Sequence, residues 1–223
     1  MKTNQDYKNS ALEALKGNWP ATVVATIIYA AIVMVCTAPS SLSGNDLSSV
    51  ISPAVALAMG GGSFILVILV SVPVQVGYCN SFRKLHQEGD ASVVGNMFSL
   101  GFNNWGHIVL GQLLMSVFVF LWSLLLIVPG IVKAYAYAMT PYILVERPEL
   151  SANEAISLSS RMMKGHKFDL FYFQLSFLGW ALLGILTLGI GFLWLSPYYM
   201  TAQAAFYQDV KAEYESKSAA SVQ

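Results

Sequence analysis

The apolar stretch from residue 107 to residue 145 constrains the fold more than any other feature of the chain. Lys133 is its only Lys, Arg, Asp or Glu residue. About 20 helical residues cross the roughly 30 Å hydrocarbon core of a bilayer, so this stretch is too long for one membrane span. Pro129-Gly130 interrupts it, and we predict a tight hairpin of two helices at that point.

The composition also indicates a membrane protein. The chain is 56% hydrophobic and only 11% charged, whereas soluble domains carry about 25% charged residues. A soluble domain of this size must cover itself with polar surface, so the shortage of charge favours the bilayer as its solvent. Twelve basic residues balance twelve acidic ones, which gives no indication of a nucleic-acid partner.

We therefore predict an all-α integral membrane protein with six transmembrane helices. The predicted spans are Trp19–Ala38, Ala54–Tyr78, His107–Val128, Ile131–Val145, Phe168–Leu188 and Ile190–Tyr207. Leu188-Gly189-Ile190-Gly191 separates the last two, as Pro129-Gly130 separates the middle two. We interpret the first apolar stretch as an uncleaved membrane helix rather than a signal peptide, because a long segment of mixed charge precedes it.

Basic residues predict the orientation. Segments 1–18, 79–106, 146–167 and 208–223 fall on one side of the six-span arrangement, and they contain all the basic residues except Lys133. Positive charge concentrates in cytoplasmic segments, so we expect both termini in the cytoplasm. Lys133 then lies near the outer end of its helix.

A weak internal repeat divides residues 1–212, which we treat as one domain, into units of about 4–88, 90–147 and 150–212. Each unit is predicted to hold a short interfacial amphipathic helix, an elbow, a span, an outer turn and a second span with a proline. The aligned positions are Gly17, Asn103 and Gly165 at the elbow, Trp19, Trp105 and Lys167 two residues later, then Thr26, Gln112 and Gln174, and finally Pro73, Pro141 and Pro197 as kinks. We expect the polar tail 213–223 to be disordered.

The stretch RMMKGHKFDL, residues 161–170, gathers basic side chains around Gly165. Ser151 and Glu154 have the spacing of a capping box and begin a helix, which Gly165 would end in a left-handed conformation. Cations are favoured at a helix C-terminus and beside anionic lipid. We interpret the stretch as an elbow rather than a dedicated phosphate or substrate site. The residues that we expect to contact lipid headgroups are Lys16, Trp19, Trp105, Lys164, His166 and Lys167.

Catalytic and metal-binding motifs are not found in the sequence. The three histidines are isolated, and no HExxH, CxxC, GxSxG or P-loop pattern is present. His166 and Asp169 would meet on one helical face, but solvated ions are ordinary at a membrane junction. We predict no catalytic residues, no metal and no cofactor.

Four glutamines within the apolar stretches are the candidate ligand-binding residues: Gln75, Gln112, Gln174 and Gln203. Polar side chains inside a membrane often have a function. Two interpretations stay open. The glutamines either form hydrogen bonds between helices, or Gln112 and Gln174, at equivalent repeat positions, line one polar cavity.

The motifs KGNW at 16–19 and MTPYIL, ELSANEAI and MMKGHK within the block 124–171 resemble an uncharacterised family of bacterial multi-pass membrane proteins, known as a domain of unknown function. The organisation is more distantly similar to the membrane domain fused to some glycerophosphodiester phosphodiesterases. The resemblance implies the bacterial cytoplasmic membrane and a lipid-rich setting. It supplies no catalytic residue.

Three functions are compared on this basis. The leading hypothesis is a non-enzymatic membrane protein that handles lipids or supports the cell envelope, with membrane lipids as its partners. The alternative is a small-solute transporter or channel, suggested by the repeats, the prolines and the glutamines. A membrane-embedded enzyme comes third. An unidentified membrane-protein partner or a homo-oligomer is compatible with each of them.

Overall fold

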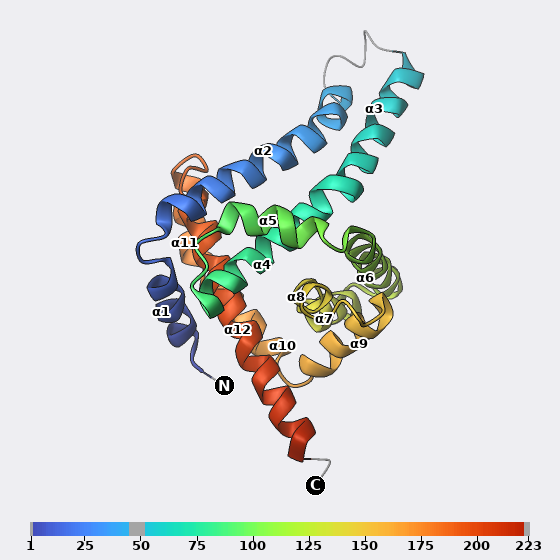
Figure 1. The fold of residues 1–223 in the computed structure, drawn as a ribbon. Coiled ribbons are helices and arrows are strands. Elements are labelled where there is room, and N and C mark those ends of the chain that lie inside the picture. The colour runs from blue at the N-terminus through green and yellow to red at the C-terminus, as the bar shows by residue number, and fades with distance from the viewer. Residues whose placement is uncertain (1, 45–51, 221–223) are drawn as a thin grey trace.

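The computed structural model describes residues 2–44 and 52–220, and the fold is built from helices (Figure 1). Within these ranges there is no strand. The helices are α1 Asn4–Leu15, α2 Trp19–Gly44, α3 Pro53–Leu66, the π-helical turn η2 Val67–Ser71, α4 Val72–Glu88, α5 Val93–Phe102, α6 Trp105–Leu125, α7 Ile127–Tyr137, α8 Thr140–Glu146, α9 Ala152–Met162, α10 Lys167–Leu175, α11 Leu178–Leu186 and α12 Phe192–Ala220.

Four helical segments are long and apolar enough to cross a membrane: Trp19–Ala38, Leu57–Glu88, Trp105–Leu125 and Lys167–Leu186. The prediction of an all-helical protein with membrane-spanning segments is thus supported, whereas six spans are not confirmed. The predicted span Ile131–Val145 is divided between α7 and α8. The 11 residues of α7 cover only about 16 Å, too little for a hydrocarbon core of about 30 Å.

Most of the last predicted span, Ile190–Tyr207, forms the first part of the much longer α12, which begins at Phe192. This helix has 29 residues and contains Pro197 in its interior. We predicted a disordered tail from residue 213, but helical structure continues to Ala220, and only residues 221–223 lie outside the described part. Contacts along α12 account for the difference, since Glu213 and Glu215 both pair with residues of other segments.

The α6–α7 hairpin turns earlier than the predicted Pro129-Gly130. The turn lies at Leu126, whose backbone is extended (φ −161°, ψ 139°). Pro129 falls in the first turn of α7, where the missing N–H costs nothing because helices begin with unpaired amides. Gly130 brings the two helices together, since a Cβ there would lie 2.7 Å from Ser123 Cα and closer still to Ser123 Oγ.

The turn between α11 and α12 agrees with the prediction. Leu188 and Gly189 both have positive φ, 54° and 90°. Such a conformation is strained for leucine and natural for glycine. The backbone amide of Gly189 donates to the Gly184 carbonyl (3.0 Å), which closes the turn.

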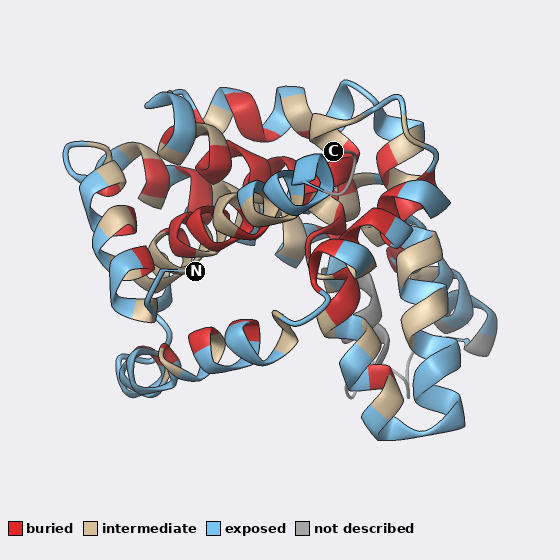
Figure 2. Cartoon of the chain, turned by 90° about the horizontal axis from the view of Figure 1, so that it is seen from below, coloured by how far each residue is buried: buried red, intermediate tan, exposed pale blue. Residues whose placement is uncertain are grey.

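The centre of the molecule holds most of its buried side chains (Figure 2). One cluster joins α1, α8, α9, α10 and α12 around Phe173 and Phe206. Another joins α1, α2, α4 and α5 around Tyr78 and Phe82. The short helices α1, α5 and α9 therefore pack on the centre through buried residues, in addition to preceding α2, α6 and α10 as predicted.

The apolar hairpins extend from this centre in different directions. Figure 1 shows α2 and α3 along their length, whereas α6 is seen nearly end-on. Their outward side chains are exposed, including Met34, Leu57 and Phe120. Three equivalent repeats are not confirmed, because Gly17 and Gly165 have positive φ while Asn103 is right-handed helical.

Candidate functional site: a groove beside the Gly165 elbow

The segment between α9 and α10 forms the predicted elbow. Ser151 and Glu154 make the reciprocal bonds of a capping box at the start of α9. Hydrogen bonds from the Ser151 hydroxyl and backbone amide lower the pKa of Glu154. The helix ends at Met162, and Gly165 follows with φ 96°. A side chain at this φ would be strained, so glycine permits the chain to turn into α10.

His166 is held between two carboxylates. Its Nδ1 lies 3.1 Å from Asp169 Oδ2, and its Nε2 lies 3.3 Å from Glu213 Oε1 on α12. A hydrogen bond from Lys217, aided by the charges of His166 and Lys217, lowers the pKa of Glu213. The expected meeting of His166 and Asp169 is confirmed, and His166 also links the elbow to α12; its predicted headgroup contact stays a prediction.

Lys164 and Lys167, on either side of this histidine, line a groove between the elbow, α7 and α10. The groove has a volume of about 460 Å³, and its lining residues are Ile131, Val132, Tyr135, Lys164, Gly165, Lys167, Phe168 and Phe171. Lys164 is exposed and Lys167 is half-buried. No carboxylate of the described residues lies within 4.0 Å of either ammonium group. The groove thus combines two uncompensated cations with an apolar lining.

The groove brings together residues that the predicted topology separates. That topology put Ile131 near the outer end of a span and Lys164 at the inner junction, on opposite faces of the bilayer. Both residues line one groove of about 460 Å³, which is far too small to bridge about 30 Å of hydrocarbon. The six-span arrangement is therefore not confirmed in this part of the chain.

Gln174 supports one wall of this groove without lining it. Tyr135 donates a hydrogen bond to Gln174 Oε1 (2.8 Å), and Gln174 Nε2 donates to the Tyr199 hydroxyl (3.1 Å). The glutamine links α7, α10 and α12 through its two polar atoms. This agrees with the first interpretation, interhelical hydrogen bonding.

The other glutamines lie elsewhere. Gln112 is buried and lines a separate cavity of about 350 Å³ between α3, η2, α4 and α6. Its Oε1 has no hydrogen-bond partner among the described residues. Gln75 is exposed and Gln203 is half-buried. The structure therefore does not bring Gln112 and Gln174 to one cavity, and the second interpretation is wrong in that respect.

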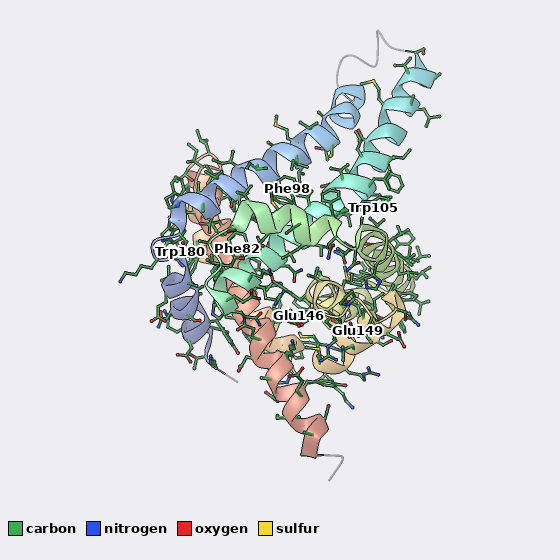
Figure 3. The ribbon with its side chains drawn as sticks, in the orientation of Figure 1. Phe82, Phe98, Trp105, Glu146, Glu149 and Trp180 are labelled. Atoms are coloured by element: carbon green, nitrogen blue, oxygen red, sulfur yellow. The ribbon has the colours of Figure 1, made fainter. Side chains whose placement is uncertain are left out.

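Trp105 has a structural contact that the sequence did not predict. Its indole Nε1 donates to the Leu69 carbonyl (2.8 Å). Pro73 explains this bond, because proline has no N–H to give to the carbonyl four residues earlier, which is that of Leu69. The bond joins α6 to the kinked segment η2–α4, at the junction marked by Trp105 in Figure 3.

The remaining predicted residues have varied settings. Trp19 lines another groove, of about 350 Å³, together with Trp180 and Trp194. Lys16 is exposed at the end of α1, beside Gly17 with φ 84°. Pro141 lies in the first turn of α8, after the interruption that ends α7.

Sequence reasoning missed a buried ionic cluster in the centre. Glu146, at the end of α8, accepts from Arg83 of α4 (2.9 Å) and from Lys211 (2.5 Å) and Tyr207 (2.7 Å) of α12. The side chains of Arg83 and Glu146 are only 8% and 10% exposed. Figure 3 shows Glu146 in the middle of the molecule. The sequence shows only that two apolar segments are followed by opposite charges, Arg83 and Glu146. This pattern does not indicate which segments contact each other.

A second polar contact holds α1 on the centre. Tyr7 donates to Asp209 Oδ2 (2.6 Å), and His86 lies between Ser10 and Gln208. Burial raises the pKa of Asp209, but the hydrogen bonds from Tyr7 and the Lys2 backbone outweigh it and lower that pKa overall. Lys8 donates to the Ser176 carbonyl (2.7 Å) at the break between α10 and α11, and burial lowers the pKa of Lys8.

Comparison with protein families gives a partial match. Residues 124–214 match a family described as "Protein of unknown function (DUF975)". This range contains the groove, Glu146 and Lys211, while the KGNW motif at 16–19 and Arg83 lie outside it. The match supports the resemblance to an uncharacterised family but not the link to glycerophosphodiester phosphodiesterases. Searches of curated proteins and of solved structures found no match.

Proposed function

We propose that the chain is a non-enzymatic, multi-pass protein of the bacterial cytoplasmic membrane that handles lipids. The observation that supports this most directly is the groove beside the elbow, which Lys164 and Lys167 line together with apolar side chains. Amphiphilic molecules match such a surface, because one part of the ligand meets charge and another meets hydrocarbon. Membrane lipids are the amphiphiles that surround a chain with four candidate spans.

We further propose that both termini are cytoplasmic. Contacts between distant charged residues support this orientation. Arg83, Glu146 and Lys211 come from three segments predicted on the cytoplasmic side, and they meet in one cluster. Arg147 and Glu215 likewise pair at 3.0 Å between two of these segments. Charged residues that flank the apolar stretches and pair with one another belong at the same face of the membrane. The excess of basic residues in these segments favours the cytoplasmic face.

Native mass spectrometry of the full chain in mild detergent tests lipid handling. We expect a stoichiometric lipid adduct on the wild type and its loss in Val132→Trp, which fills the groove. The matched control is Val117→Trp, which fills the separate cavity beside Gln112 and should keep the adduct. Absence of any adduct from the wild type, or equal loss in both variants, would contradict the proposal. Solute flux in liposomes without retained lipid would favour the transporter hypothesis instead.

A further inference from the structure

We propose that the groove beside the Gly165 elbow selects phospholipids with a net negative headgroup, whose phosphate lies between the ammonium groups of Lys164 and Lys167. This inference rests on the proposed lipid-handling function and names the ligand class of the same site. It comes from the balance of charge around the elbow, from the shape of the groove and from a comparison with the tryptophan-lined groove.

Several charged side chains around the elbow have a partner within the chain, whereas Lys164 and Lys167 at the groove and the exposed Arg161 at the end of α9 have none among the described carboxylates. His166 faces Asp169 and Glu213, and Lys217 pairs with Glu213 at 2.6 Å. Lys211 and Arg147 are paired with Glu146 and Glu215. Lys164 and Lys167 have no carboxylate of the described residues within ion-pair distance. Two uncompensated cations in the lining of one groove complement an anion.

The start of α10 adds to this positive charge. Lys167 and Phe168 are the first two residues of the nine-residue helix, and no side chain caps its N-terminus. Amide groups in the first turn of a helix point away from the helix body without intrahelical partners and attract negative charge. Both residues line the groove. Asp169 in the same turn offsets part of this effect, so the two lysines provide most of the positive charge at the groove.

The rest of the groove favours an acyl chain over a soluble anion. Ile131, Val132, Phe168 and Phe171 are 52%, 42%, 73% and 40% exposed. Tyr135 completes this wall, with its hydroxyl bonded to Gln174. Free phosphate would leave this surface without a partner, whereas a lipid covers it with hydrocarbon. A volume of about 460 Å³ accommodates a headgroup and the adjoining part of one chain, while the rest of the lipid stays in the bilayer.

The groove that contains Trp19 lacks these charges. Its lining consists of Leu12, Trp19, Trp180, Leu183, Gly184, Thr187, Gly191, Trp194, Leu195 and Tyr198. It offers apolar surface and indole groups but no ammonium group. Lipid that contacts this groove should show no preference for anionic headgroups, so of these two grooves we expect headgroup selectivity at the elbow groove.

The experiment measures headgroup preference with native mass spectrometry. Wild-type protein is incubated with equal amounts of phosphatidylglycerol and phosphatidylcholine of the same chain length. We expect a preference for phosphatidylglycerol of about tenfold or more, since each lysine near anionic lipid strengthens attraction several-fold. The double variant Lys164→Gln/Lys167→Gln should retain lipid with nearly equal amounts of the two classes.

The control is Lys2→Gln/Lys84→Gln, which removes the same net charge from exposed or weakly paired lysines away from the groove. It should keep the wild-type preference, and helix content by circular dichroism shows that each variant is folded. This inference, but not lipid handling, would be overturned by lipid that binds the wild type without headgroup preference. An equal loss of the preference for phosphatidylglycerol in both double variants would also overturn it. No lipid of either class on the wild type would overturn the proposed function itself. Displacement of phosphatidylglycerol by inorganic phosphate alone would show a phosphate site instead of a lipid site.

Discussion

The centre of the molecule and the hairpins that extend from it are stabilised in different ways. In the centre, α1, α4, α8 and α12 exchange hydrogen bonds and ion pairs between side chains far apart in sequence. In the hairpins α2–α3 and α6–α7, large apolar side chains point outward, as at Met34 and Leu124. The centre therefore depends on partners within the chain, while the hairpins depend on surrounding lipid. The elbow groove lies where the two regions meet.

The largest effect is expected from breaking the ionic cluster of the centre. Glu146→Gln removes the charge that Arg83 and Lys211 share, and an uncompensated buried charge costs about 3–5 kcal/mol. Denaturant titration of the purified protein should show this loss in the free energy of unfolding. Glu215→Gln is the control, since the Arg147–Glu215 pair is 40% and 50% exposed and should contribute about 1 kcal/mol or less. Equal effects of the two variants would contradict the distinction between a buried and an exposed pair.

A smaller effect is expected at the α6–α7 hairpin. Gly130→Ala puts a methyl group 2.7 Å from Ser123 Cα and should cost about 1–3 kcal/mol by overpacking. In α6 of the same hairpin, Gly106 has no atom within 4 Å of its Cβ position. Gly106→Ala should therefore be neutral or stabilising. Thermal unfolding monitored by circular dichroism distinguishes the two variants, and a stabilised Gly130→Ala would show that the helices do not pack this closely.

The bond between Trp105 and the kinked helix should contribute about 1 kcal/mol. Trp105→Phe keeps the aromatic ring but removes the donor to the Leu69 carbonyl. Exchange of the backbone amides of residues 67–72 should become faster in this variant. The control Trp180→Phe removes an indole N–H that has no hydrogen bond to the described residues, and amide exchange of residues 67–72 should not change.

The smallest effect is an acid-induced loosening of α1. The pKa of Asp209 in the folded protein is below its ordinary value of 3.8. The carboxylate therefore stabilises the fold fully above that value, and the contribution disappears as the pH falls through the lower, folded-state pKa. Protection of the α1 amides, corrected for intrinsic exchange, should decrease over that range. Asp209→Asn should show reduced protection at neutral pH and lose this pH dependence; an unchanged pH profile would contradict the role of the Tyr7–Asp209 bond.

Local features were predictable from sequence, whereas contacts between distant segments were not. The capping box of Ser151 and the left-handed Gly165 depend on a few neighbouring residues, so the pattern alone indicated them. The predicted position of the hairpin at Pro129 was wrong, because proline occurs both in loops and in the first turn of helices. Gln112 and Gln174 occupy aligned positions but have different surroundings. A residue's position within its helix does not determine which other helices its side chain contacts. Arg83 and Glu146 carried no signal of their pairing.

Photo-crosslinking with phosphatidylglycerol that carries a photoreactive group near its headgroup tests the central claim most directly. After illumination of the protein in bilayers, peptide mass spectrometry locates the modified residues. The lipid-groove account predicts labelling concentrated on Ile131–Tyr135 and Lys164–Phe171, reduced by Lys164→Gln/Lys167→Gln. Labelling spread evenly over α2, α3 and α6, or concentrated around Trp19 and Trp180, would contradict it.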